Sequence, residues 1–175
     1  MILFHYTTAS AIQQIRKDGI IRKSVGNILI NNTVSLTTDT DPRGHGLPDG
    51  REITMAQAQH LNPISRNGKL YCHDHTEFRI VLSIPQEDPL LAPAWMRNKP
   101  DELLGMDIAA WNPIDVRIPD CELLDIHRKI MTNALPRKSK TWWYYLTDIP
   151  CSLIDRLEVR NSSGVYVPSA WISDS

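Results

Sequence analysis

Cysteine is scarce in this chain, and its pattern excludes a disulfide framework. The 175 residues include three cysteines, Cys72, Cys121 and Cys151, which are odd in number and widely spaced. Small secreted domains that depend on disulfides carry more cysteines at closer spacings. We therefore expect reduced thiols in a cytoplasmic protein.

Long apolar runs are also missing. No segment approaches the roughly 20 apolar residues that span a bilayer. His5 interrupts the apolar run at the start of the sequence, which is unlike a signal peptide. The formal net charge is −1, so the overall charge attracts neither nucleic acid nor a membrane surface. We expect a cytoplasmic protein without a membrane partner.

Glycine is rarer than proline, with 8 residues against 12, and the Gly-Lys-Ser/Thr signature of a phosphate-binding P-loop is absent. Hydrophobic residues make up 42% and charged residues 22%, as in an ordinary globular domain. We find no repeat, low-complexity tract or linker, so residues 1–175 are predicted to form a single domain.

The predicted elements follow one another as short strands with one early helix, which indicates a β-rich α+β fold. The helix is predicted over residues 9–18, with Thr8 as its N-cap and Gly19 as its left-handed C-terminal residue. Strands are predicted at 2–6, 34–37, 76–84, 141–146 and 156–159. A loop is predicted at 41–50, helical turns within 52–61, and a second helix at 101–110.

His5 stands where the first predicted strand opens into the helix. A histidine in that position is held by the backbone while its ring stays available to a ligand. Thr7 and Thr8 add hydroxyl groups beside it. A neutral imidazole can donate a hydrogen bond to a ribose hydroxyl. The alternative is a partly buried histidine that is bonded to a neighbouring carbonyl.

A second group of hydroxyl side chains ends the strand predicted at 34–37. Thr37 and Thr38 precede acidic residues and a glycine-rich turn that contains His45. Glycines allow the backbone of such a turn to approach a ligand closely. The two strand ends together predict one cleft for a polar ligand such as a nucleotide. The alternative for residues 34–38 is an ordinary strand followed by a loop.

Glu77 and Arg79 are two residues apart on the strand predicted at 76–84, so they are expected to share one face. In a cleft, Glu77 would supply a carboxylate and the Arg79 guanidinium would hold a phosphate. On the surface, the same two residues would form an ordinary ion pair.

The run Cys72-His73-Asp74-His75 contains only residue types that bind metals. Adjacent residues of an extended chain point to opposite faces, so no more than two of the four could share one ion. No Cys-x-x-Cys or His-Glu-x-x-His motif supplies further ligands. We expect no metal, and we keep a metal-assisted hydrolase built on this run as a third hypothesis.

Residues 136–145 form the basic and aromatic stretch of the chain. Its cations are Arg137, Lys138 and Lys140, and Trp142 follows them. Cations of this kind bind phosphates, and an indole ring stacks on bases. The stretch therefore indicates nucleic-acid contact, and its alternative is a solvated turn before a core strand.

The order of these motifs resembles that of the ADP-ribosyltransferase superfamily, which includes DarT-type toxins that modify DNA and RNA 2′-phosphotransferases. Uncharacterised bacterial proteins carry similar blocks. The blocks are His5-Tyr6-Thr7 with its helix, the strand at 34–38, and the late strand, proline turn and final strand at 142–159. The resemblance implies a split antiparallel β-sheet core with a few helices.

The resemblance also implies NAD as a substrate. His5 would orient the ribose beside nicotinamide, and Arg79 would hold the pyrophosphate. The further cofactor-binding positions are Tyr6, Thr7, Thr37, Thr38 and His45. Such a transferase would modify RNA or DNA in the cytoplasm as a toxin or antiviral-defence effector, with a neutralising antitoxin protein as a partner.

The family's catalytic glutamate would fall near Trp142 or Trp143, and no carboxylate is there. The expected catalytic residues are therefore His5 and Glu77, with Asp39 and Asp41 as further candidates for the acid. The alternative is a module of the same fold that binds a nucleotide or nucleic acid without turning it over.

Overall fold

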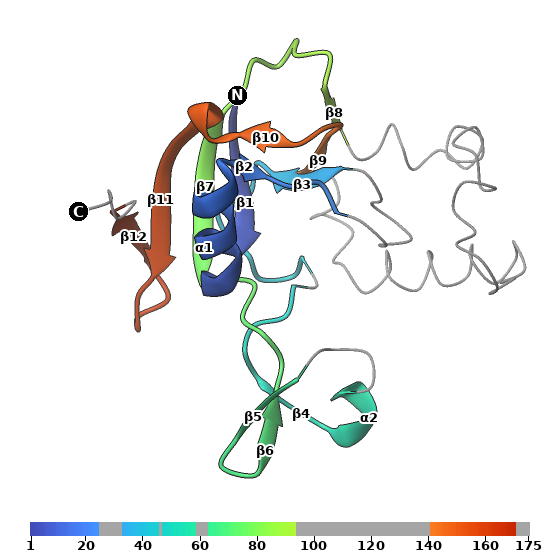
Figure 1. The fold of residues 1–175 in the computed structure, drawn as a ribbon, viewed down its shortest axis with the longest axis vertical. Helices are drawn as coiled ribbons and strands as arrows, with labels where there is room; N and C mark the ends of the chain where they lie inside the picture. Colours follow the sequence, from blue (N-terminus) through green and yellow to red (C-terminus); the bar gives the residue numbers. More distant parts are fainter. Residues whose placement is uncertain (25–32, 46, 59–62, 94–140, 171–175) are drawn as a thin grey trace, which may run out of the picture.

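The computed structural model describes residues 1–24, 33–45, 47–58, 63–93 and 141–170. One large antiparallel sheet dominates it (Figure 1). Its strands are β1 (Ile2–Thr7), β3 (Val34–Thr37), β7 (Phe78–Ser83), β8 (Leu91–Pro93), β9 (Trp142–Tyr145), β11 (Ile154–Arg160) and β12 (Tyr166–Ser169). They lie in the order β12-β11-β7-β1-β3-β9-β8. The predicted β-rich α+β class is confirmed.

Helix α1 (Ala9–Asp18) forms where the sequence predicts it, and both of its predicted caps are present. The Thr8 hydroxyl accepts a hydrogen bond from the Ala11 amide at 3.2 Å, a contact that stabilises a helix by about 1 kcal/mol. Gly19 adopts φ 70°, which a residue with a side chain reaches only at a cost. These caps fix the start of the helix directly after β1.

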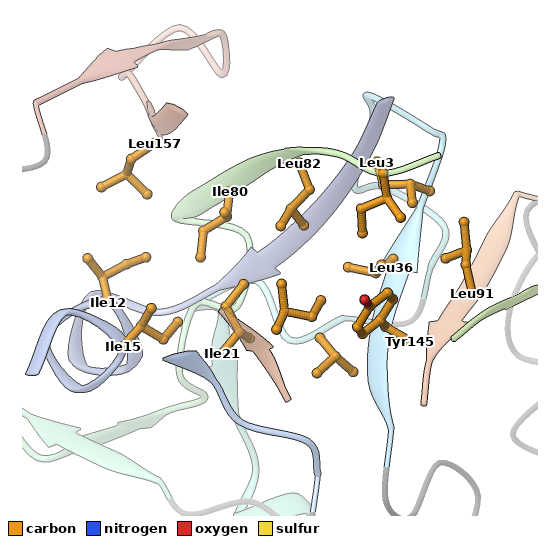
Figure 2. Close-up of a cluster of buried hydrophobic side chains, with 13 residues drawn as sticks. Leu3, Ile12, Ile15, Ile21, Leu36, Ile80, Leu82, Leu91, Tyr145 and Leu157 are labelled. Carbon is orange, nitrogen blue, oxygen red and sulfur yellow. The ribbon is translucent and has the colours of Figure 1, made fainter. Parts of the chain in front are cut away.

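The main core lies between the sheet and α1. Ile12 and Ile15 of the helix face Ile80 and Leu82 of β7 across this core (Figure 2). A two-stranded sheet packs on the same side and adds Ile21 and Ile149; it consists of β2 (Ile20–Ile21) and β10 (Ile149–Pro150). A 3-10 turn at Cys151–Leu153 leads from β10 into β11.

The large sheet consists of two halves that meet at a single residue pair. Strand β1 pairs with β7 along its whole length, from Ile2 opposite Ser83 to Thr7 opposite Phe78. Its register with β3 is confined to Phe4 opposite Thr37. Beyond that pair β3 turns away from the direction of β1 (Figure 1). The half β12-β11-β7-β1 and the half β3-β9-β8 therefore diverge beside the end of β1, and we call this point of divergence the opening.

A small three-stranded sheet projects from the main body (Figure 1). It contains β4 (Glu52–Ile53), β5 (Ile64–Arg66) and β6 (Lys69–Tyr71), and the short helix α2 (Met55–Ala58) follows β4. The helical turns predicted within 52–61 are thus partly present. Neither helix of the described residues is long and apolar enough to cross a membrane.

The five predicted strands all occur, with ends that differ from the prediction by at most two residues. The strands β2, β4, β5, β6, β8, β10 and β12 were not predicted. The helix expected at 101–110 lies outside the described residues.

Candidate functional site

Two predicted site residues, His5 and Thr7, lie next to the opening between β1 and β3, on the α1 side of the sheet. Side chains alternate along a strand, so His5 and Thr7 lie on the same side as Leu3, which belongs to the core under α1. Thr7 is buried and pairs with Phe78, the residue that follows Glu77. Glu77 precedes β7, and its main-chain oxygen accepts from the Arg160 amide at 2.9 Å. Because Phe78 packs on the α1 side, alternation directs the Glu77 side chain to the opposite side, away from His5 and Thr7.

His5 spans the opening through its side chain. Its Nδ1 atom lies 3.0 Å from the main-chain oxygen of Ser35 on β3. A carbonyl oxygen only accepts, so Nδ1 carries the proton and Nε2 of the neutral ring is an acceptor. Within the described residues, Nε2 makes no hydrogen bond. His5 is thus bonded to a neighbouring carbonyl, as one hypothesis expected, and binding of a ligand through Nε2 stays a prediction.

The charge state of His5 follows from its surroundings. Burial lowers its pKa from 6.5, and the hydrogen bond to Ser35 opposes that shift. A positive charge on His75 would lower the pKa further. The imidazole is therefore neutral at pH 7, and it can accept a hydrogen bond through Nε2 instead of donating one.

Arg79 lies on the far face, which we define as the side of the large sheet opposite α1. Its Nε atom donates to Glu158 at 2.6 Å, and its Nη1 atom donates to the carbonyl oxygen of Thr40 at 2.8 Å. The guanidinium carbon is 4.7 Å from the centre of the Phe4 ring and 4.3 Å from that of Tyr166. The structure does not bring Arg79 together with His5, although both were predicted to bind one ligand.

Three further residues predicted to bind the cofactor, Tyr6, Thr37 and His45, also lie away from His5, whereas Thr7 is on its side. Tyr6 and Thr37 lie on the far face, because Tyr6 packs there with Phe4 and Thr37 pairs with Phe4. The Tyr6 hydroxyl donates to the Asp39 carbonyl oxygen at 3.0 Å, and burial raises the pKa of Tyr6. Thr38 is exposed at the end of β3.

His45 lies on the far face between Trp142 and Asp39. The indole Nε1 of Trp142 donates to His45 Nδ1, and His45 Nε2 lies 3.5 Å from Asp39 Oδ2. The main-chain amide of Asp39 donates to the Thr37 hydroxyl at 3.0 Å. We call these residues, with Tyr6, Arg79 and Glu158, the far-face network. It fastens the segment after β3 to the sheet.

Glu158 is the buried carboxylate of the far-face network. Its side chain is 6% exposed and forms an ion pair with Arg79. It also accepts a hydrogen bond from the Nε atom of Arg156 at 2.7 Å. Burial raises its pKa, but the two arginines outweigh that effect and the pKa lies below 4.5. The sequence places Glu158 in a predicted strand, and nothing local marks it as the partner of Arg79.

The two tryptophans of β9 point to opposite sides. Trp142 pairs with Thr37 on the far face, whereas Trp143 packs against the core on the α1 side. Arg137, Lys138 and Lys140, predicted to contact nucleic acid, lie outside the described residues. Strand β9 itself carries no carboxylate.

The run from Cys72 to His75 is engaged elsewhere. Asp74 accepts from Nη2 of Arg160 at 2.6 Å and from the Thr76 hydroxyl at 2.7 Å. Among the residues with described positions, no group of three or more His, Cys, Asp and Glu side chains is arranged to hold a metal ion.

Sequence reasoning missed two features of the site. The Ser35 carbonyl that fixes His5 is a main-chain group, so no residue pattern could identify it. His75 was considered only as a metal ligand, yet its charge bears on His5. No family model, curated protein or solved structure significantly matches this chain.

Proposed function

We propose that the opening between β1 and β3 binds the nicotinamide–ribose end of NAD, and that the domain is an ADP-ribosyltransferase. The observation that carries this proposal is His5. Its Nδ1 atom is fixed by Ser35 across a split antiparallel sheet, and its Nε2 atom is left as an acceptor. A ribose hydroxyl is a donor of suitable chemistry for a neutral imidazole. The motif order of the sequence adds the resemblance to the superfamily.

In the proposed reaction, the bond between ribose C1′ and the nicotinamide nitrogen breaks, and nicotinamide leaves as a neutral molecule. The acceptor forms the new bond to C1′ and gives up its proton. His5 orients the ribose by accepting from a hydroxyl. Glu77, next to the residue that pairs with Thr7, is the proposed carboxylate that stabilises the developing positive charge and receives the proton.

We propose nucleic acid as the acceptor. The support is the sequence of the basic stretch, in which Arg137, Lys138 and Lys140 precede the aromatic strand β9. Cations and rings in this combination contact phosphates and bases. In this proposal the protein acts in the cytoplasm as a toxin or defence effector, and a neutralising antitoxin protein would be its partner.

A second candidate function is binding of the same ligand without transfer. It is favoured by β9, where Trp143 stands on the α1 side and no carboxylate is present. Glu158 is a buried glutamate, but it forms ion pairs with Arg79 and Arg156 on the other side of the sheet. In this function the protein would recognise NAD and leave its glycosidic bond intact.

The test is incubation with NAD labelled in its adenylate part, together with separate pools of RNA, DNA and protein. Transfer predicts free nicotinamide and label on nucleic acid, and the variant His5→Ala loses both. His73→Ala is the matched control, because it removes a histidine outside the opening. Binding of NAD without nicotinamide release would instead establish the second candidate, and no binding at all would refute both.

A further inference from the structure

The small sheet of β4, β5 and β6 projects from the main body as an arm with two unlike faces (Figure 1). On one face Ile53 and Leu70 are directly opposite each other, and Ile53 is buried. Side chains alternate along a strand, so the neighbours of these two residues point to the other face, which we call the arm face. The arm face consists of Glu52, Ile64, Arg66, Lys69 and Tyr71. The side chains of Glu52 and Lys69 are more than half exposed, so this face meets solvent.

Two cations stand at the turn of the arm face. Arg66 and Lys69 are directly opposite each other, on either side of Asn67 and Gly68. Arg66 is exposed, and its guanidinium forms no ion pair with any residue whose position is described. Lys69 donates to Glu52 at 2.8 Å, and an exposed pair of this kind contributes little to stability. A phosphate can therefore reach the first cation directly and compete with Glu52 for the second.

Tyr71 and Ile64 form the apolar part of the arm face. They are directly opposite each other, Tyr71 lies on the central strand of the small sheet, and both side chains are half-buried. Lys69 is two residues away on the same strand, which corresponds to about 7 Å. Proteins that bind single strands of nucleic acid combine a ring on which bases stack with cations that follow the backbone. The arm face presents both kinds of contact side by side.

The arm joins the large sheet at the end where β1 finishes. Strand β7 begins at Phe78, which is directly opposite Thr7, the last residue of β1. A short connection leads from the arm to β7, and within it Asp74 forms an ion pair with Arg160 of β11 at 2.6 Å. The arm is therefore anchored at the same end of the sheet as the opening.

We propose that the arm face binds single-stranded nucleic acid, with a base stacked on Tyr71 and phosphates held by Arg66 and Lys69. The inference deepens the proposed function and rests on it for the role of the bound strand, which would be the acceptor. A single strand is favoured over a duplex, because the bases of a duplex are stacked on one another and cannot reach the ring. Stacking and phosphate contacts accept any base, so little sequence preference is expected from this surface.

The experiment measures the affinity of the full chain for fluorescein-labelled oligo(dT) and oligo(U) of about 12 nucleotides by anisotropy, without NAD. Tyr71→Ala is expected to weaken binding about 10-fold, whereas Tyr71→Phe, which keeps a ring, should lose little. Arg66→Gln should weaken binding and lower the slope of log affinity against log salt concentration by about 0.7, the value for one phosphate contact. Glu52→Gln should strengthen binding, because it removes a negative charge and frees Lys69. The matched control Lys17→Gln changes an exposed cation of α1 and should leave the affinity unchanged.

Arg66→Gln and Glu52→Gln keep the test decisive if Tyr71→Ala does not fold, because both change exposed side chains. Unchanged affinity in these variants, an equal loss in Lys17→Gln, or tighter binding to a duplex would overturn the inference. Binding of polyglutamate in place of the oligonucleotides would also overturn it and would indicate a protein partner. Nicotinamide release is measured separately on the same proteins. Oligonucleotide binding without that release would refute the proposed transferase and leave the arm face as a binding surface.

Discussion

The two sides of the large sheet carry similar polar residue types, but these side chains differ in how many hydrogen bonds they make within the chain. On the α1 side, His5 uses one nitrogen to reach Ser35 and keeps the other. On the far face, Arg79 is bonded to Glu158 and Thr40 and is enclosed by the rings of Phe4 and Tyr166. The comparison separates a side chain with one ring nitrogen unbonded within the described residues from a side chain that is bonded and enclosed by its own fold.

This difference shows why residue type alone does not identify a site. A histidine, an arginine and hydroxyl groups near strand ends suit a nucleotide in either location. Whether such a side chain can bind a ligand depends on its partners within the chain. A guanidinium that already bonds a carboxylate and a carbonyl has fewer donors left for a phosphate. The largest stability effects are therefore expected on the far face, and the largest functional effects on the α1 side.

The largest expected effect comes from Arg79→Met, which leaves Glu158 buried beside a single arginine. Removing one partner of a buried ion pair costs about 3–5 kcal/mol of unfolding free energy. Urea denaturation measures it. The matched control is Arg156→Met: its side chain is 51% exposed, and it should cost less than about 1 kcal/mol. Similar losses of unfolding free energy in both variants would mean that the buried pair of Arg79 and Glu158 does not stabilise the fold more than an exposed ion pair does.

Glu77→Gln tests whether the proposed carboxylate acts together with His5 of the α1 side. If Glu77 stabilises charge in the transition state, turnover should fall about 100-fold while the affinity for NAD changes little. Single-turnover rates and calorimetry separate the two quantities. The control Glu87→Gln changes a carboxylate in the loop after β7 and should leave both unchanged. Equal loss of rate and affinity in Glu77→Gln would assign it to binding.

The pH dependence of NAD binding tests the acceptor role of His5. The pKa of His5 lies below 6.5, so affinity should be constant above that pH and fall about tenfold per unit below the pKa, as Nε2 gains a proton. Folding stability should fall in the same direction, because the unfolded chain binds this proton more readily. In His5→Gln, whose amide does not titrate, this pH dependence should disappear. A midpoint above 6.5 would contradict the assignment.

The smallest expected effect is the stability change of His5→Ala. The variant loses one hydrogen bond across the opening, which is worth about 1 kcal/mol, while β1 keeps its six-residue pairing with β7. Thermal unfolding should show a small shift with loss of NAD binding. A loss as large as that of Arg79→Met would make His5 a structural residue and remove the contrast between the two sides.

Local signals account for the parts of the fold that the sequence predicts. Helix α1 was predicted to the residue because Thr8 and Gly19 act on their immediate neighbours. The hairpin of β5 and β6 was missed although Asn67-Gly68 marks its turn, with φ 50° and 74°. The Asn-Gly pair is a turn signal that the sequence contains. The strands on either side of it are only three residues long, so their alternation of polar and apolar residues was too short to detect.

The candidate site depended on contacts that local patterns do not contain. Alternation shows that Tyr6 and His5 face opposite ways, yet it does not show which side carries the ligand. Arg79 and Glu158 are 79 positions apart, so their pairing exists only after β7 and β11 lie together. The resemblance to a known superfamily suggested one cleft, and the structure distributes its residues over two sides.

The strand order has a consequence for how this protein is made. Strand β1 precedes the other strands in sequence, yet it lies between β7 and β3 in the interior of the sheet, and β11 and β12, which follow them in sequence, form one edge. Pairings between residues this distant in sequence form slowly. Until β11 is synthesised, Arg79 lacks Glu158 and β7 presents an uncovered edge. Strand β1 can therefore pair once β3 and β7 are present, whereas the other edge of β7 stays open until β11 lies against it. An open strand edge can pair with other chains, so the interval before β11 forms is the one in which this fold is exposed to aggregation.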